Sequence, residues 1–226
     1  MEQMKRFAVY YAPPAGDFAD RAAGWLGWAA DAGKPVAQPD LGLPAAEITV
    51  DPRRYGFHGT LKPPFRLAEG QSRAALDRAL TDLTARLAPV TLPALHLQRI
   101  GGFLALLPQG DDLPLLELAA EVVSALDGFR APLNPAEIAK RRPERLSVRQ
   151  RELLDRWGYP FVMEEFRFHL TLTDKLPADL AERAEPLLAA HFAPVLPQPF
   201  VISDLCLFGE AQDGQFHILH RYALSG

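Results

Sequence analysis

The sequence contains two copies of one short pattern, His-x-Thr between apolar residues, about half the chain apart. They are Phe57-His58-Gly59-Thr60-Leu61 and Phe168-His169-Leu170-Thr171-Leu172. Side chains two residues apart on an extended strand share a face, so each His is expected beside its Thr. Two such strands facing one small anion would surround it with two imidazoles and two hydroxyls. The predicted catalytic residues are His58, Thr60, His169 and Thr171.

This set of groups suits the hydrolysis of a cyclic phosphodiester. That reaction needs a base to activate water and an acid to protonate the departing sugar oxygen, and the ordinary His pKa of about 6.5 suits both roles. The Thr hydroxyls would donate to the non-bridging phosphate oxygens as charge develops there. The sequence leaves open which imidazole is the acid. Run in the other direction, the pair could activate a 2′-hydroxyl for cyclisation or transfer.

Polar residues beside the motifs and in a basic stretch are candidates for substrate binding. Residues 140–156 are the most basic part of the chain, and the planar guanidinium group matches phosphate oxygens. Acidic residues are mixed into the same stretch, which favours a solvated face; a phosphate-reading edge of the cleft is the alternative. The predicted substrate-binding residues are Arg54, Tyr55, Lys62, Arg141, Arg142, Arg145, Arg221 and Tyr222.

No metal or cofactor is predicted, because the sequence has no convincing cluster of carboxylates and histidines at ligand spacing. The other four histidines are not followed two residues later by Thr or Ser, and we interpret them as structural: His96, His191, His217 and His220. Tyr10 and Tyr11 alternate faces of a strand, so one is expected in the core and the other could line the cleft.

Composition limits the class of protein. A net charge of −4 over 226 residues disfavours binding along a long nucleic acid, whereas a small phosphorylated substrate, or less favourably an RNA end, remains compatible. The single Cys206 excludes an internal disulfide. The apolar run Phe7–Ala12 is too short for a signal peptide core or a membrane span. We therefore expect a cytoplasmic protein without a membrane partner, and the oligomeric state stays open.

The elements that would position the motifs occur in a repeated order. Strands are predicted around each motif (55–61 and 166–173), and each is followed by an amphipathic helix and then by two strands around a turn. A further strand at 7–12 and a helix from Asp17 through Trp25 and Trp28 precede them. The predicted fold is α+β: one bilobal domain (1–226) of two pseudo-symmetric lobes, each an antiparallel sheet with helices on its outer face, with the active cleft between them. The lobes are expected at 1–130 and 160–226, joined by the basic segment 131–159.

The paired His-x-Thr motifs resemble the 2H phosphoesterase superfamily, which includes RNA 2′,3′-cyclic phosphodiesterases and bacterial 2′–5′ RNA ligase-like proteins. The longer stretches Arg54–Lys62, Glu165–Thr173 and Arg6–Pro13 resemble a narrower branch, associated with bacterial phosphonate-degradation operons. The resemblance covers nearly the whole chain. It implies a metal-independent phosphoesterase fold but does not fix the substrate.

The predicted function is hydrolysis of a small cyclic phosphodiester of a sugar or nucleotide, with a role in phosphonate metabolism. A ribose with a 1,2-cyclic phosphate and a 5-phosphate would place one group at the His pair and the other near the basic segment. The alternatives are a non-catalytic module that binds a phosphorylated ligand or an RNA end, and an accessory protein of a phosphonate-degrading assembly. The two intact His/Thr pairs favour the enzyme.

Overall fold

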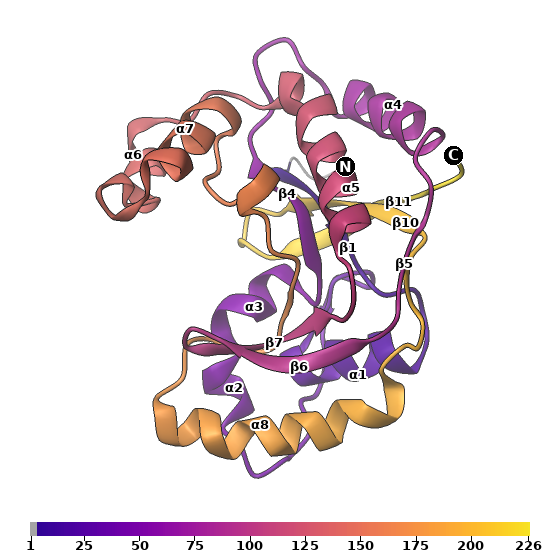
Figure 1. Ribbon diagram of the computed structural model, residues 1–226, viewed down its shortest axis with the longest axis vertical. Coiled ribbons are helices and arrows are strands. Elements are labelled where there is room, and N and C mark those ends of the chain that lie inside the picture. The colour runs from indigo at the N-terminus through magenta and orange to yellow at the C-terminus, as the bar shows by residue number, and fades with distance from the viewer. Residues whose placement is uncertain (1–3) are drawn as a thin grey trace.

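A seven-stranded antiparallel sheet forms the centre of the protein, in the order β11-β10-β1-β4-β8-β7-β6 (Figure 1). The computed structural model describes residues 4–226 and confirms the α+β class. The strands of this sheet are β1 (Phe7–Tyr11), β4 (Gly59–Phe65), β6 (Leu95–Ile100), β7 (Phe103–Pro108), β8 (Leu170–Thr171), β10 (Asp204–Glu210) and β11 (Phe216–Ala223). Two short pairs complete the strands: β2 (Trp28–Ala29) with β3 (Lys34–Pro35), and β5 (Val90–Leu92) with β9 (Phe200–Ile202).

The helices pack on this sheet around one main hydrophobic core. Helix α5 contacts β4, α4 contacts β11, and α8 contacts β6 and β7 (Figure 1). Their buried faces meet the strands in a cluster that includes Trp25, Leu80, Leu188 and Phe200. The helices are α1 (Asp17–Leu26), α2 (Ala45–Ile48), α3 (Val50–Tyr55), α4 (Arg73–Thr84), α5 (Leu113–Ala125), α6 (Pro135–Lys140), α7 (Val148–Trp157) and α8 (Ala178–Phe192).

The predicted duplication is visible in the order of elements. The run β4-α4-β5-β6-β7 is followed later in the chain by β8-α8-β9-β10-β11. Equivalent members of the two runs pair with each other: β4 with β8 through Gly59 and Leu170, and β5 with β9. The two runs therefore meet where the two motif strands pair.

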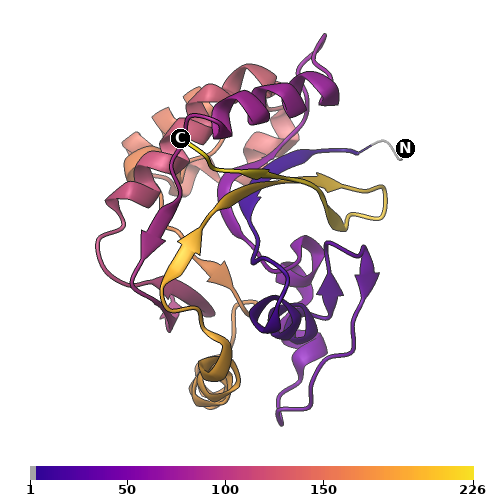
Figure 2. The same cartoon turned by 90° about the vertical axis from the view of Figure 1, so that its right-hand side faces the viewer.

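The two runs are intertwined, which differs from the expected lobes at 1–130 and 160–226. Strands β1 and β4 from the first half form one side of the sheet with β10 and β11 from the second, while β8 joins β6 and β7 on the other side. Helix α4 of the first run likewise packs on β11 of the second, and α8 packs on β6 (Figure 2). Each side of the sheet is thus built from both halves of the chain. The first three residues of the expected domain lie outside the described ones.

Some predicted boundaries were wrong for identifiable reasons. Helix α1 ends at Leu26 because Gly27 adopts the left-handed conformation (φ 82°), and this places Trp28 on β2. Residues 50–55 form α3, so the first motif strand begins only at Gly59. Strand β4 continues through Pro63 and Pro64, because β8 pairs with it at Gly59 alone and that edge needs no further N–H donors.

Residues 131–159, here called the arm, leave the body of the protein and return to it. Helices α6 and α7 lie in the arm and project to one side in Figure 1. Both begin with a capping box, formed by Asn134 and Glu137 in α6 and by Ser147 and Gln150 in α7. Local side chains therefore fix where these two short helices begin.

Candidate active site

The two motifs have the same pattern of exposure. From Phe57 to Leu61, and again from Phe168 to Leu172, buried residues alternate with partly exposed ones, and the partly exposed positions are His and Thr. The buried Phe and Leu residues belong to the hydrophobic core. Each motif is thus anchored by its apolar positions, and the same alternation turns its His and Thr to the opposite face.

Both imidazoles are held in the same way by the backbone. Nδ1 of His58 lies 2.8 Å from the carbonyl oxygen of Gly56, and Nδ1 of His169 lies 2.8 Å from that of Arg167. A carbonyl oxygen can only accept, so each Nδ1 carries a proton and donates it. Each Nε2 is therefore the atom left to exchange a proton with a substrate.

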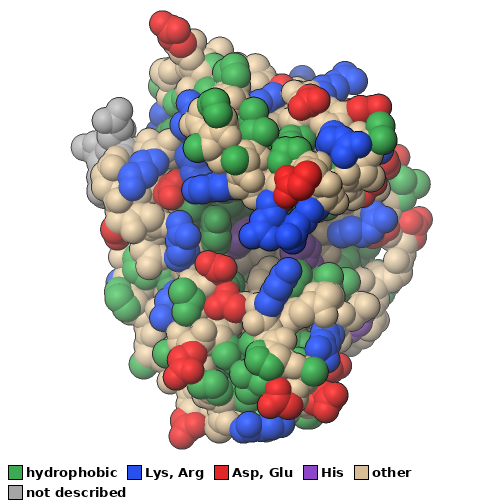
Figure 3. Space-filling view, turned by 90° about the vertical axis from the view of Figure 1, so that its left-hand side faces the viewer, with side chains coloured by type: hydrophobic (Ala, Val, Ile, Leu, Met, Phe, Trp, Pro, Cys, Tyr) green, Lys and Arg blue, Asp and Glu red, His purple; other side chains and the backbone are tan. Residues whose placement is uncertain are grey.

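One cavity of about 860 Å³ collects all four motif side chains. His58 and Thr60 line it from one strand, His169 and Thr171 from the other. In Figure 3 histidine side chains lie inside a hollow bordered by Lys and Arg side chains. The hydroxyls of Thr60 and Thr171 have no hydrogen-bond partner among residues 4–226, which leaves both available to a ligand.

His58 is the more enclosed of the two histidines. Its ring stacks on Tyr10 with 4.0 Å between ring centroids, and Tyr55 lies 5.6 Å away. Burial lowers the pKa of His58 to about 4; the Gly56 carbonyl opposes this shift, and the charge of His169 adds to it. His58 is therefore neutral at neutral pH, with a free lone pair on Nε2. His169 has one aromatic neighbour, Phe103, at 5.6 Å.

A carboxylate from the end of the second motif positions the first. Asp174 accepts hydrogen bonds from the backbone N–H groups of Val50 (2.9 Å) and Asp51 (3.0 Å), the first residues of α3. The side chain of the N-cap residue, Thr49, makes no capping hydrogen bond to this helix. Asp174 therefore satisfies the exposed donors of the helix that leads directly to His58.

Charged pairs border the cavity. Arg6 and Arg54 both approach Glu210, at 2.5 Å and 3.9 Å, and Arg66 makes a bidentate pair with Glu137 at 3.0 Å and 2.9 Å. Glu210 is 6 % exposed, so its pairing with Arg6 compensates a buried charge.

Three of the eight predicted substrate-binding residues line the cavity: Arg54, Tyr55 and Arg141. The others lie elsewhere. Arg142 and Arg145 are exposed on the arm outside the cavity lining, where Arg145 pairs with Glu144.

The two C-terminal candidates also lie outside the cavity lining. Arg221 donates to the carbonyls of Ala12 and Pro13 and pairs with Asp204, so it ties β11 to the end of β1. Tyr222 is buried in the core and donates to Asp77 of α4. Both residues act as links between elements.

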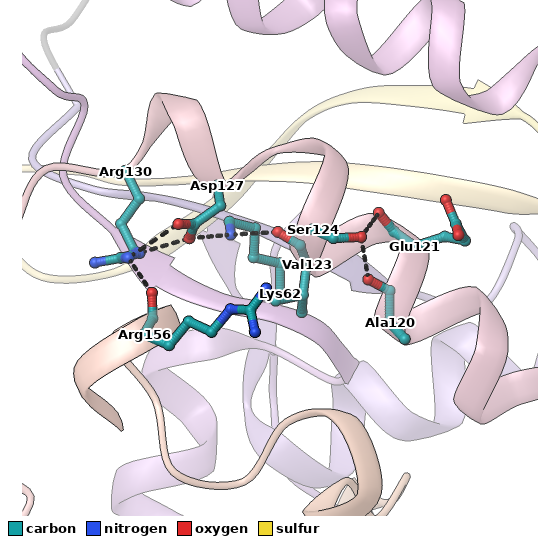
Figure 4. A network of polar contacts seen from close by, with 8 residues as sticks. All are labelled: Lys62, Ala120, Glu121, Val123, Ser124, Asp127, Arg130 and Arg156. Atoms are coloured by element: carbon teal, nitrogen blue, oxygen red, sulfur yellow. Dashed lines mark hydrogen bonds and ion pairs between the residues drawn. The ribbon is translucent and has the colours of Figure 1, made fainter. Parts of the chain in front are cut away.

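Lys62 also faces away from the cavity, because the strand alternation is interrupted. Thr60 pairs with Tyr10 and Lys62 with Val9, so Leu61 is an extra residue, a β-bulge, and Lys62 turns to the core side. Its ammonium contacts the Val123 carbonyl at 3.0 Å and Asp127 at 3.4 Å (Figure 4). Burial lowers the pKa of Lys62 to about 8, although Asp127 raises it.

The cavity includes residues that the motifs did not indicate. Tyr159 and Lys140 enter it from the arm, Arg66 from beyond β4 and Glu210 from β10. Tyr10 occupies the cavity side of β1, and Tyr11 packs in the core against Phe200 at 5.1 Å, as the alternation allowed. The basic stretch 140–156 included Lys140, whereas no sequence pattern indicated Tyr159, Arg66 or Glu210.

Two further observations concern the described part of the chain. No three His, Cys, Asp or Glu side chains within residues 4–226 gather into a group that could hold a metal ion. Within the same residues, no helix has both the length and the apolar character needed to cross a bilayer.

Two curated relatives match most of this chain. Both are named ribose 1,5-bisphosphate phosphokinase PhnN. The protein from Janthinobacterium sp. (strain Marseille) is 37% identical over 94% of this chain and 49% of its own length, and that from Laribacter hongkongensis (strain HLHK9) is 41% identical over 92% and 49%. The chain thus spans about half the length of these relatives.

Similar solved structures include E. coli LigT complexed with 3′-AMP (16% identity, TM-score 0.46, 99% and 100% of the two chains) and TT0787 of Thermus thermophilus (14%, 0.48, 98% of each). Another is described as a phosphoesterase (17% identity, TM-score 0.44, 99% and 100% of the two chains). Residues 60–217 match a family described as a protein of unknown function, DUF1045. This match covers more than half of the sequence, and the chain belongs to the DUF1045 family.

Proposed function

We propose that the chain is a metal-independent phosphoesterase of the 2H type that hydrolyses a small cyclic phosphodiester. The observation that carries this proposal is the pair of equivalent motifs lining one cavity, each with its His Nδ1 bound to a backbone carbonyl and its Thr hydroxyl unpartnered among residues 4–226. Two Nε2 atoms and two hydroxyls then face the space where a phosphate would lie.

In the proposed reaction His58 is the base and His169 is the acid. Nε2 of His58 takes a proton from water as the water oxygen bonds to phosphorus. The bond from phosphorus to one ring oxygen breaks, and Nε2 of His169 donates a proton to that oxygen. Thr60 and Thr171 donate to the non-bridging oxygens, whose charge grows in the transition state. The closer enclosure of His58 supports the assignment, because burial keeps this imidazole neutral in the free protein.

The names of the relatives point to a specific substrate. A ribose that carries a 1,2-cyclic phosphate and a 5-phosphate would, on cleavage of the bond between phosphorus and O2, give ribose 1,5-bisphosphate. Both relatives are named for that compound. We therefore propose a role in phosphonate metabolism, with this sugar phosphate preferred to the end of an RNA.

The test is a turnover assay followed by phosphorus NMR, with the cyclic ribose phosphate as substrate. Acid/base groups typically contribute 10²–10⁴-fold each, so His58→Ala and His169→Ala should each lower kcat by about that factor. His220→Ala is the matched control, because His220 is exposed and lies outside the cavity lining. Activity should also survive exhaustive chelation with EDTA. Wild-type rates in either motif variant would refute the acid/base roles. Phosphate binding without turnover would favour the alternative of a binding module.

A further inference from the structure

The arm contributes part of the cavity lining, here called the arm end of the cavity. Lys140 and Arg141, from the end of α6, line it together with Tyr159, which follows α7. The arm is attached to the body at this point, because Arg66 forms the bidentate pair with Glu137 and also donates to the carbonyl of Pro132 at 2.7 Å. Lys140 and Arg141 are therefore held at the cavity by a fixed connection.

Three tyrosines line the cavity, Tyr10, Tyr55 and Tyr159, and a protein group already covers one face of each ring. Tyr10 stacks on His58, and Tyr55 stacks on Phe216 with 4.8 Å between centroids. The guanidinium of Arg141 lies over the ring of Tyr159 at 4.6 Å. A nucleobase needs an open aromatic face on which to stack, and one face of each of these rings is already occupied by a protein group.

The hydroxyls of these tyrosines are available as donors. Within residues 4–226 none of Tyr10, Tyr55 and Tyr159 has a hydrogen-bond partner for its hydroxyl, although Tyr10 is only 1 % exposed and lines the cavity. Burial raises the pKa of Tyr10 and of Tyr159, and a charge on Tyr55 would raise both further, which means that the three phenols are near each other. Tyr10 and Tyr159 are therefore neutral at physiological pH and can donate.

The cations beside the tyrosines are also without carboxylate partners in the described residues. Neither Lys140 nor Arg141 forms an ion pair, whereas Arg145 and Arg149, on the same arm, pair with glutamates. Two of the carboxylates that line the cavity are already paired, Glu137 with Arg66 and Glu210 with Arg6. This end of the cavity thus combines free positive charge with free neutral donors.

We propose that Arg141, Lys140 and the hydroxyls of Tyr10, Tyr55 and Tyr159 bind a second phosphate group, so that the substrate is a cyclic phosphodiester that also carries a phosphomonoester. A phosphomonoester oxygen set accepts several hydrogen bonds and carries the charge that Arg141 and Lys140 would balance. This inference rests on the proposed function for the position of the cyclic phosphate at His58 and His169. Beyond that function, it assigns the selection of the substrate to these five residues.

The experiment compares two substrates and one product-like ligand. Wild-type kcat/KM should be at least about 100-fold higher for ribose 5-phosphate 1,2-cyclic phosphate than for 2′,3′-cyclic AMP, which lacks the second phosphate. Arg141→Met keeps most of the packing on Tyr159 but removes the charge, and it should lower the ratio of the two kcat/KM values at least 10-fold. Tyr159→Phe removes one hydroxyl donor and should lower the same ratio by a smaller factor. Arg145→Met is the matched control on the same arm and should keep the wild-type ratio.

Binding of ribose 5-phosphate, measured by calorimetry, separates this inference from the proposed function. Loss of that binding in Arg141→Met but not in Arg145→Met supports the second phosphate site even in a protein that hydrolyses neither substrate. Equal wild-type kcat/KM values for the two substrates would overturn the site and leave the phosphoesterase chemistry standing. A preference for 2′,3′-cyclic phosphates at RNA ends, or ribose 5-phosphate binding that is unchanged in Arg141→Met, would overturn it as well.

Discussion

His58 and His169 occupy equivalent positions but differ in their surroundings, and this difference should appear in the pH dependence of the reaction. Protonated His58 cannot accept a proton from water, so kcat/KM should fall as the pH falls through the pKa of His58 in the free protein, about 4. Tyr10→Phe keeps the stacked ring and should leave the pH of this fall in kcat/KM, the acidic limb of the profile, unchanged. Tyr10→Ala admits water and should move the limb toward the ordinary His value of about 6.5. A limb that stays near pH 4 in Tyr10→Ala would show that enclosure by Tyr10 does not set the pKa.

Lys62 offers a second test at the scale of one residue, because a basic residue beside a motif is readily taken for a phosphate ligand. Lys62→Met keeps the volume of the side chain and leaves Asp127 paired with Arg130 at 2.8 Å. The variant ends the cost of burying the Lys62 ammonium, and Asp127, which is partly exposed, is not left unpaired because it keeps Arg130. We expect kcat/KM to stay within about twofold of wild type and the free energy of unfolding, from urea titration, to be equal or higher. A loss of activity at unchanged stability would place Lys62 in the reaction after all.

Sequence spacing was sufficient to indicate the four motif residues at the cavity, because strand alternation is a local rule that depends only on neighbours. The same rule failed just after Thr60. The bulge at Leu61 reverses the face of Lys62, and nothing in the residue types around it marks that reversal. Tyr159 and Glu210 come to the site from distant segments, so spacing gave no sign of them.

At the scale of elements, the contact between β4 and β8 explains why the first motif has Gly where the second has Leu. A Cβ on Gly59 would lie 2.3 Å from Cζ of Phe168, the residue that precedes the second His. Gly59→Ala should therefore lower the free energy of unfolding by about 1–3 kcal/mol, the usual range for overpacking. Activity should fall with it, because Phe168 anchors the strand that carries His169.

A double-mutant cycle measures this contact directly. Phe168→Leu removes the ring atoms that a new Cβ would meet, so Gly59→Ala should cost less in the Phe168→Leu background than in wild type. Additive effects on stability would show that the two residues do not compete for the same space.

Element types were predicted well where apolar periodicity was long, and less well at boundaries. Helix α4, the hairpin β6–β7 and helix α8 all occur in the predicted order after the motif strands. Motif strand β8 is only two residues long, since the extended residues around it have few partners in the sheet. Which strands pair depends on the whole fold, and the strand propensity of one segment does not predict it.

At the scale of the whole molecule, the intertwined runs predict how the chain responds to cutting. Arg145 is an exposed residue of the arm, and trypsin cleaves after arginine. We expect the cleaved protein to stay associated at the size of the intact chain in gel filtration, because each side of the sheet needs strands from both fragments. Residues 1–145 and 146–226, produced separately, should each lack cooperative unfolding by circular dichroism. A folded, soluble fragment from either half would contradict the shared sheet.

The same exchange of strands sets when the site can form during synthesis. The surroundings of His58 include Phe208 on β10, and Tyr55 rests on Phe216 of β11. Both strands follow His58, the arm and His169 in the chain, so the ribosome synthesises them last. Because domains that depend on contacts between distant residues fold slowly, the nascent chain must hold its apolar strands unpaired until the last of them emerges. Chaperone demand in the cell, and the recovery of active protein from dilute refolding, should therefore depend on the C-terminal hairpin more than on either motif.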